Sequence, residues 1–438
     1  MKNTFAKKIL SSVLSVVMIT FSILSFSSCG ANNSGNIASA RLNERGELVL
    51  MFSDGSEKNI GAISNEGTTI NIQSGDDSVL AATTAGLVSA VSVTAYFEKT
   101  VNNSYGGFFP GFGGGTSTSQ YYSKGSGVIY DIDRENGSAF IITNYHVVYD
   151  SASNSADGIS NDIEVYLYGA ENEKYAISAE YVGGSLYYDI AVLYVENCPA
   201  LINSVYNGVK VADPDNVAVG ATAIAVGNPR GVGIAASLGI VSVASEYITM
   251  TAADGQSTVS FRVIRVDTAI NSGNSGGGLY NSAGELIGIV NAKIVASDVE
   301  NIAYAIPSNI AISVAENIID NCFGKSNRTV MRALIGVTLG TTDSVAVIDE
   351  ELGIIKIKET VNVAEVAPNG VSYGKLKVGD IIKTITVGAK TVEVTRGYHL
   401  IDAMLDARVG DTVKINIIRG GKEMTVDILI TDNAIATY

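Results

Sequence analysis

Between residues 125 and 307 the chain consists of short apolar runs, rich in β-branched residues, that Gly, Asn and Asp interrupt. Runs of this length separated by turn residues predict strands rather than helices. After this range Ile310, Val314 and Ile318 repeat at helical spacing, with Ser308 as the expected N-cap. The pattern therefore predicts an all-β domain, a barrel or a sandwich, that closes with a helix reaching about residue 320.

The chain before this domain has a different pattern. Residues 29–80 are polar, and within them residues 46–56 form one apolar run and an Asp-Gly turn. This predicts a small β-hairpin on a polar stalk. Residues 81–97 begin an apolar segment that leads into the β domain. The glycine- and phenylalanine-rich stretch 106–115 then interrupts the pattern, and its glycines predict a long loop.

The first 28 residues have the pattern of a targeting segment, because three lysines precede an apolar run that ends at Cys29. This arrangement resembles a bacterial lipoprotein signal, which implies that Cys29 is lipidated as the first residue of the mature chain. Phe26 stands where that signal usually has leucine, so an uncleaved membrane anchor remains the alternative. Both interpretations place the body outside the cytoplasm, tethered to a bacterial cell membrane.

The first candidate for chemistry is Ser275, in the sequence Gly273-Asn274-Ser275-Gly276-Gly277. A serine hydroxyl is a poor nucleophile at neutral pH, so acyl transfer needs a neighbouring base and donors for the oxyanion. The glycines allow the backbone N–H groups of Gly273 and Ser275 to point toward one place, which predicts an oxyanion hole. Alone, the motif is equally compatible with a glycine-rich turn.

A base and its partner are suggested by residues elsewhere in the β domain. The chain has two histidines, and His146 follows an apolar run that predicts a strand. Asp189 begins a strongly apolar strand, where a carboxylate is costly unless it is paired. Pairing with the second ring nitrogen of His146 would fix its tautomer and stabilise the imidazolium. Taken singly, they also fit a buried histidine and a strand cap.

The order His146, Asp189, Ser275 is that of chymotrypsin-type double β-barrels. His399 lies in a predicted surface helix and is assigned no chemistry.

The motifs around these residues resemble those of the HtrA/DegP family of extracytoplasmic serine proteases. They comprise residues 143–148, 189–193 and 273–277, with further similarity at 125–129, 227–231 and 303–309. The resemblance covers about residues 80–431. It implies a chymotrypsin-like double β-barrel, a serine endopeptidase that acts on unfolded or damaged exported proteins, and a homo-trimer or larger oligomer. The chemistry needs no metal or organic cofactor.

The residues before the nucleophile and the strand after it line the pocket for the substrate residue before the cut in such a barrel. Here these are Ala269, Ile270 and Asn271 before it, and Ile287 and Val290 after it. None of them is acidic, so a basic substrate side chain would lack a buried partner. The sequence therefore predicts a preference for small aliphatic residues.

Residues 332–431 carry more charge than the β domain and form a second folding unit. Leu334-Ile335-Gly336-Val337 resembles the loop of a PDZ domain whose successive N–H groups bind a peptide's C-terminal carboxylate. Residues 374–382 and 409–421 resemble later turns and strands of that α+β fold. The first four residues alone also fit a buried strand, but their place ahead of the other two motifs favours the PDZ interpretation.

Charge narrows the choice of partners. Without residues 1–28, which hold three lysines and no acid, the chain has 26 basic and 44 acidic residues, a net charge of −18. Such a balance argues against nucleic acid as a partner. Besides Cys29 the chain has Cys198 and Cys322, which could bridge, although two buried or unpaired thiols are favoured.

The sequence thus predicts an all-β protease domain followed by an α+β PDZ domain. The expected ranges are 1–28 for the signal, 29–80 for the stalk, 81–322 for the protease and 332–431 for the PDZ domain. The predicted partners are unfolded polypeptides, peptide C-termini at the PDZ domain, and the membrane through the N-terminus. The alternative function is a catalytically resting chaperone or sensor that mainly binds unfolded proteins.

Overall fold

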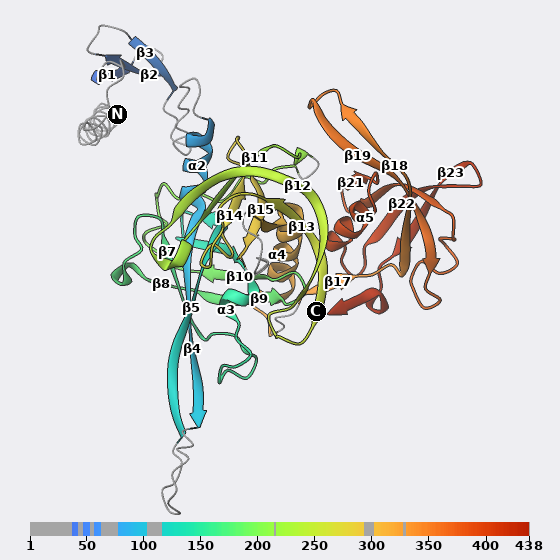
Figure 1. Cartoon of the computed structure of the whole chain (residues 1–438), viewed down its shortest axis with the longest axis horizontal. Helices are drawn as coiled ribbons and strands as arrows, with labels where there is room; N and C mark the ends of the chain where they lie inside the picture. Colours follow the sequence, from blue (N-terminus) through green and yellow to red (C-terminus); the bar gives the residue numbers. More distant parts are fainter. Residues whose placement is uncertain are drawn as a thin grey trace, which may run out of the picture. The chain divides into compact units, whose positions relative to one another are not determined.

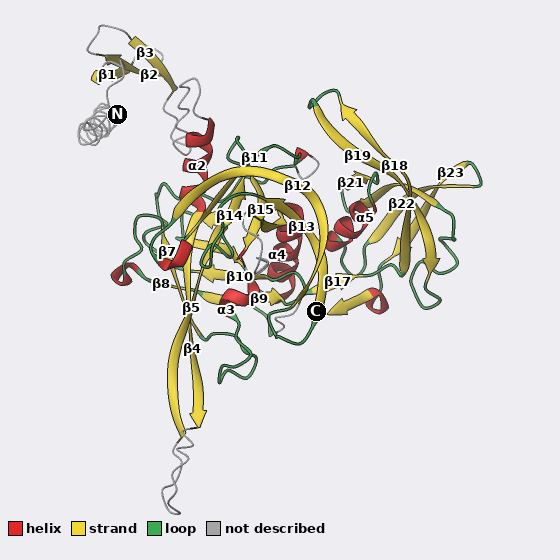
Figure 2. Ribbon diagram, in the orientation of Figure 1, coloured by secondary structure: helices red, strands yellow, loops and turns green. Residues whose placement is uncertain are grey.

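Strands dominate the structure, a computed structural model (Figure 2), as the sequence predicts. The chain divides into two units, Met1–Asp77 and Ser78–Tyr438. The described residues are 37–42, 47–52, 57–62, 78–102, 116–213, 216–292, 302–326 and 330–437. The predicted signal 1–28, the lipidation site Cys29 and the predicted loop 106–115 lie outside these residues.

The first unit contains a small antiparallel sheet. Its strands are β1 (Ile37–Leu42), β2 (Glu47–Phe52) and β3 (Glu57–Ala62), in the order β1-β2-β3. The predicted hairpin of residues 46–56 corresponds to β2 and the segment after it. The structure adds β1, which pairs with the other edge of β2.

The second unit begins with helix α2 (Ser78–Ser89) and continues into a seven-stranded sheet (Figure 1). The strand order is β8-β7-β4-β5-β6-β10-β9. The strands are β4 (Ala90–Asn102), β5 (Thr116–Asp133), β6 (Ser138–Thr143), β7 (Asp162–Leu167), β8 (Ile177–Ser178), β9 (Glu180–Ser185) and β10 (Ile190–Val195). Val91, Ile141, Val165 and Leu193 come from four of these strands and are buried in one apolar cluster.

The next six strands form a closed barrel in the order β11-β12-β13-β16-β15-β14. They are β11 (Thr222–Gly227), β12 (Ala235–Thr251), β13 (Thr258–Val266), β14 (Gly278–Tyr280), β15 (Leu286–Asn291) and β16 (Ala303–Pro307). The predicted pair of β structures is therefore present, and this second one closes as a barrel.

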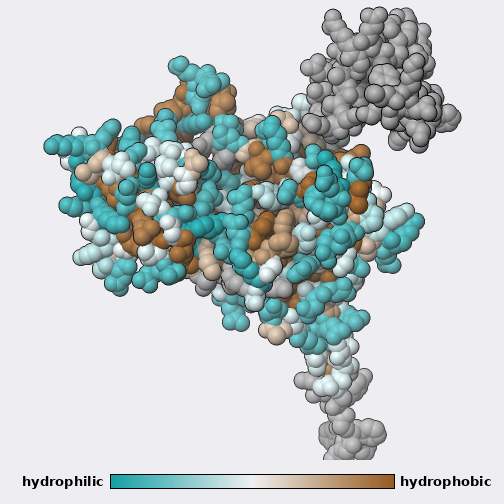
Figure 3. All heavy atoms as spheres, turned by 180° about the vertical axis from the view of Figure 1, so that it is seen from behind, coloured by the Kyte–Doolittle hydropathy of each residue, from teal (hydrophilic) through white to brown (hydrophobic). Residues whose placement is uncertain are grey.

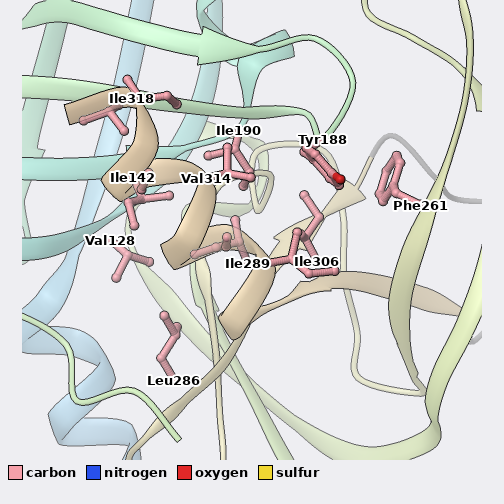
Figure 4. Close-up of a cluster of buried hydrophobic side chains, with 14 of the residues drawn as sticks. Val128, Ile142, Tyr188, Ile190, Phe261, Leu286, Ile289, Ile306, Val314 and Ile318 are labelled. Carbon is pink, nitrogen blue, oxygen red and sulfur yellow. The ribbon is translucent and has the colours of Figure 1, made fainter. Parts of the chain in front are cut away.

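Helix α4 (Ser308–Cys322) packs on both β structures through the apolar positions predicted from its spacing. Figure 4 shows this shared core, which includes Val128, Ile142, Ile190, Ile289, Ile306, Val314 and Ile318. The predicted N-cap is wrong by one residue. Pro307 occupies the cap position, and Ser308 is the first helical residue, with a buried hydroxyl that has no hydrogen-bond partner within the described chain. Proline fits this place because it has no N–H to lose.

The C-terminal domain is a sheet of order β18-β19-β20-β22-β23, with β21 paired to β20 and a two-stranded sheet of β17 and β24. Its elements are β17 (Met331–Ala333), β18 (Val337–Asp349), β19 (Ile354–Val366), β20 (Ile381–Val387), β21 (Lys390–Glu393), α5 (Gly397–Ala403), β22 (Thr412–Arg419), β23 (Lys422–Leu429) and β24 (Ile435–Thr437). Val363, Ile385, Leu400 and Ile415 form part of its own core, so this domain has the α+β composition predicted.

The surface of the molecule is mixed in character. Hydrophobic residues form small patches among hydrophilic ones in the view of Figure 3. Cys198 and Cys322 are both buried, and neither forms a disulfide bond, in agreement with the favoured interpretation of the sequence. Over the residues that the structure describes, no helix has both the length and the apolar character needed to cross a membrane.

Candidate active site

His146 and Asp189 meet because their strands are neighbours. β6 and β10 pair antiparallel, with Thr143 opposite Ala191, so the chain after β6 lies beside the chain before β10. After β6 the chain forms the short helix α3 (Tyr145–Val148), which holds His146. Asp189 has a left-handed backbone with φ 53°, unusual for a residue with a side chain and a mark of local constraint.

The carboxylate of Asp189 binds His146 at two points. The Nδ1 atom of His146 lies 2.6 Å from Oδ2 of Asp189, and the backbone N–H of His146 donates to Oδ1 at 2.9 Å. The side chains are 19 % and 7 % exposed, respectively. This geometry leaves Nε2 of His146 as the ring nitrogen available to a substrate or nucleophile.

The backbone of Asp189 is also fixed, through its carbonyl oxygen. This oxygen accepts hydrogen bonds from the Nδ2 of Asn144 at 2.8 Å and from the backbone N–H of Tyr145 at 3.2 Å. The ring of Tyr145 stacks on Tyr149 with centroids 4.9 Å apart. Burial raises the pKa of Tyr145, so its hydroxyl stays neutral at physiological pH.

Ser275 lies in the loop before β14 of the closed barrel, and this loop is held against the first sheet. Its carbonyl accepts the N–H of Ser126 in β5 at 2.8 Å. The next residue, Gly276, has φ 85°, and a Cβ there would lie 2.2 Å from the carbonyl oxygen of Ser126 and 2.4 Å from Oγ1 of Thr143. Only glycine permits this close approach. The contacts therefore bring the loop that carries Ser275 against β5 and β6 of the first sheet.

The loop before Ser275 keeps two N–H groups free. Among the described residues, neither Gly273 N–H nor Ser275 N–H has an acceptor. The carbonyls of the loop are engaged elsewhere, because that of Ser272 accepts the N–H of Arg230 at 2.8 Å and that of Gly273 accepts the hydroxyl of Ser126 at 2.7 Å. With both carbonyls held, the free N–H groups are available to an anion.

The hydroxyl of Ser275 has a different partner from the one expected. Its Oγ accepts the backbone N–H of Ala292 at 3.3 Å, and between Ser275 and His146, both of them described, there is no hydrogen bond. The structure thus brings the three predicted residues into one region and joins two of them directly.

Two polar residues of the site were missed in the sequence. Asn291, at the end of β15, donates from Nδ2 to Oδ2 of Asp189 at 2.8 Å. Ser126 in β5 donates to Gly273 and accepts the N–H of Asn228 at 2.7 Å. Both are nearly fully buried. For Asn291 the available signal was a single polar residue at the end of the otherwise apolar β15, since it needs a buried partner, whereas β5 is largely polar and gives no such signal for Ser126.

The five predicted pocket residues divide by burial. Ala269 and Asn271 are exposed, and Ile270 is partly buried against the core of the second barrel. Ile287 and Val290 belong to that core and are 3 % and 0 % exposed. The pocket itself stays a prediction.

The predicted carboxylate-binding loop lies between two strands of the C-terminal domain. Leu334, Ile335 and Gly336 connect β17 to β18, and Val337 begins β18, an edge strand of its sheet. Gly336 has φ 75° and packs against Gly370. Within the described chain, the N–H groups of Ile335 and Gly336 have no acceptor. Successive free N–H groups beside an open strand edge suit the carboxylate end of a peptide.

Comparison with protein families agrees with this division. A family model for the trypsin-like peptidase domain matches residues 125–289, and a model for the PDZ domain matches residues 333–430. The fold and these matches define a trypsin-like peptidase with a C-terminal PDZ domain.

Relatives cover most of the chain. The serine protease Do-like HtrA of Bacillus subtilis (strain 168) is 34 % identical over 313 residues, which are 70 % of this chain but 63 % of that protein, less than two thirds of its length. The Do-like HtrA of Lactococcus lactis subsp. cremoris (strain MG1363) is 31 % identical over 358 residues, 78 % of this chain and 80 % of the relative. The chain belongs to the family of Do-like HtrA serine proteases.

The family membership confirms the resemblance and the enzyme class inferred from the sequence, a serine endopeptidase. Among solved structures, the HtrA-type protease AlgW with decapeptide covers 80 % of this chain and 97 % of its own, at 24 % identity and a TM-score of 0.48.

Proposed function

We propose that this protein cleaves peptide bonds with His146, Asp189 and Ser275. The observation that carries the proposal is the carboxylate of Asp189, which binds both the ring and the backbone of His146 next to a serine flanked by two free N–H groups. Ser275 attacks the peptide carbonyl, and His146 takes its proton and returns it to the leaving amine. Asp189 stabilises the imidazolium, and the N–H groups of Gly273 and Ser275 bind the oxyanion.

In this proposal the described conformation is a resting one. In the proposed mechanism the side chain of Ser275, whose Oγ here accepts the N–H of Ala292, turns so that its hydroxyl donates to Nε2 of His146. A long bond of 3.3 Å to a single neutral donor is weak, so a bound substrate can replace it. This feature also supports a second candidate, a chaperone or sensor that binds unfolded proteins and cleaves them only when activated.

The proposed substrates are unfolded or damaged polypeptides with small aliphatic residues before the cut. Support for the side-chain preference comes from Ala269, Ile270, Asn271, Ile287 and Val290, none of which is acidic. The class of substrate follows from the family. The PDZ domain is proposed to bind the C-terminal carboxylates of peptides at residues 334–337, with the peptide added to the free edge of β18.

The proposed location is the outer face of a bacterial cell membrane. The relatives DegQ and DegP of Escherichia coli (strain K12) are named as periplasmic endoproteases, which supports an extracytoplasmic place for this chain. Lipidation of Cys29, with an uncleaved anchor as its alternative, would tether it there. A homo-trimer or larger oligomer is proposed from the family alone.

The test is casein degradation by the full chain in detergent, beside Ser275→Ala. We expect cleavage by the wild type and none by the variant. A peptide with an apolar C-terminus should raise the rate, and the same peptide with an amidated C-terminus should not. If neither protein cleaved casein while both bound the peptide, the binding function would replace the proposed enzyme.

A further inference from the structure

Asn291 bonds the oxygen of Asp189 on which the proposed mechanism depends. Its Nδ2 lies 2.8 Å from Oδ2 of Asp189, and this same oxygen is 2.6 Å from Nδ1 of His146. Asn291 is 1 % exposed. Oδ2 therefore has two donors, and the carboxylate of Asp189 is largely buried, while Oδ1 accepts the backbone N–H of His146.

We propose that Asn291 is a positioning residue for the cleavage reaction, which acts through Asp189 and does not touch the substrate. The inference rests on the proposed function of His146, Asp189 and Ser275. The backbone of Asp189 is fixed by Asn144 and Tyr145. The carboxylate itself is held by His146, and the bond from Asn291 to Oδ2 further restrains its rotation about the side-chain bonds.

The chemistry of a carboxamide suits this place better than that of a charged residue. A lysine or arginine would compete with the imidazolium for the negative charge of Asp189, and an acid would repel it. A neutral amide donates one hydrogen bond, satisfies the lone pairs that His146 leaves free and keeps the carboxylate ionised. Only the charge that forms on His146 during catalysis then balances Asp189.

The position of Asn291 in the chain links both halves of the site. The next residue, Ala292, donates its N–H to Oγ of Ser275 at 3.3 Å. Two consecutive residues at the end of β15 thus bond the carboxylate that orients the base and the nucleophile itself. A displaced Asn291 side chain would disturb the separation between these two groups, whose alignment sets the rate.

The experiment compares three variants of the full chain on a short chromogenic peptide. Asn291→Leu keeps a similar volume without a donor, Asn291→Ser keeps a shorter donor, and Asn317→Leu is the matched control. Asn317 is 2 % exposed and donates from Nδ2 to the carbonyl of Met331, away from the site. Loss of one hydrogen bond to a charged group corresponds to about a 10- to 100-fold change.

We expect this loss in kcat for Asn291→Leu with KM nearly unchanged, a partial recovery in Asn291→Ser, and wild-type kcat in Asn317→Leu. Full activity in Asn291→Leu would overturn the proposal. So would an equal loss in Asn291→Leu and Asn317→Leu, since that would mark a general effect of burying leucine. Thermal melts identify a variant that fails to fold, and the comparison then rests on Asn291→Ser.

A second readout is independent of cleavage. The chain has two histidines, so the ring N–H signals in a proton NMR spectrum are few, and His399→Gln assigns them. In a Ser275→Ala background we expect the downfield Nδ1–H signal of His146 to move upfield in Asn291→Leu and to recover in Asn291→Ser. An unchanged signal would refute the positioning role even if the protein proved not to cleave peptides. If the wild-type protein did not cleave the peptide, while the Nδ1–H signal of His146 still moved in Asn291→Leu, the proposed function would be refuted and the positioning role would not.

Discussion

The two halves of the active site differ in how firmly their groups are held. The half with the base is saturated, because every oxygen of Asp189 has a protein donor and Nδ1 of His146 binds its carboxylate at 2.6 Å. In the half with the nucleophile, the backbone is tied to β5, but the hydroxyl of Ser275 has one bond of 3.3 Å to a backbone N–H. In the proposed mechanism, the base is thus assembled in advance, and the nucleophile is not.

This difference indicates where control of the enzyme lies. Changing the base half would require breaking several short bonds in a buried place, which is costly. Turning the serine side chain breaks only its 3.3 Å bond to Ala292 and costs far less. A ligand that favours the turned serine therefore needs to supply only a small differential binding energy.

The largest expected effect comes from breaking the base half. The neutral amide in Asp189→Asn lacks the negative charge with which the carboxylate accepts the hydrogen bond from Nδ1–H, and the tautomer of His146 is no longer fixed. We expect kcat to fall by about 10⁴-fold. Peptide cleavage and the rate of labelling by a serine-directed phosphonate measure it, and both should fall together. Labelling at the wild-type rate would mean that His146 does not activate Ser275.

The next effect comes from moving the oxyanion loop. Gly273 has φ 97°, and a Cβ there would lie 2.3 Å from the carbonyl oxygen of Asn228. Gly273→Ala should therefore displace the loop and its two free N–H groups, and kcat should fall by about 10²- to 10³-fold. Gly255→Ala is the matched control, since Gly255 has φ 71° in a turn with no atom within 4 Å of the added Cβ. If Gly273→Ala and Gly255→Ala lost similar amounts of activity, the assignment of the oxyanion hole would be wrong.

A smaller effect is expected from Ser126, which supports that loop from β5. Ser126→Ala removes the donor to Gly273 and leaves the N–H of Asn228 without its acceptor. We expect the free energy of unfolding to fall by about 1–3 kcal/mol and kcat/KM by about 10-fold. Ser160→Ala, a buried serine of the same domain that bonds Tyr96 and Asp162, should cost stability without this loss of rate. Denaturant titration and peptide kinetics separate the two quantities.

The smallest effect on cleavage is expected in the PDZ domain. Burial would raise the pKa of Asp380, but bonds from Arg419 and the N–H of Lys377 outweigh it, and its pKa lies below that of an ordinary aspartate. A lowered folded pKa stabilises the domain above the ordinary value, and this stability is lost as the pH falls through the folded pKa.

We therefore expect the melting temperature of the domain to fall as the solution is acidified below about pH 4. Asp380→Asn should remove that dependence and leave cleavage of short peptides unchanged at neutral pH. Asp349, which pairs with Lys356 on an exposed hairpin, is the control, and Asp349→Asn should melt almost as the wild type does. A drop in peptide cleavage with Asp380→Asn would show that the protease domain depends on the PDZ fold.

Local patterns predicted the strands, helix α4 and the three residues His146, Asp189 and Ser275, because each is marked by its immediate neighbours in the chain. Ser126 and Asn291 escaped, since their partners Gly273 and Asp189 are more than a hundred residues away. Helix α2 also escaped. Its residues and those of β4 form one continuous apolar stretch, which carries no period that separates a helix from a strand.

The bond between Ala292 and Ser275, like the left-handed backbone of Asp189, depends on packing between the two β structures. No pattern in the sequence specifies it.

The site is divided between two separately built parts of the chain, with His146 and Asp189 on the first sheet and Ser275 and Asn291 on the second barrel. In the proposed mechanism, the chain has to complete both parts before it can cleave a peptide bond. Synthesis of the first sheet alone yields a base without a nucleophile. In that mechanism cleavage begins only when both β structures are folded, and an incompletely folded copy is harmless to its neighbours.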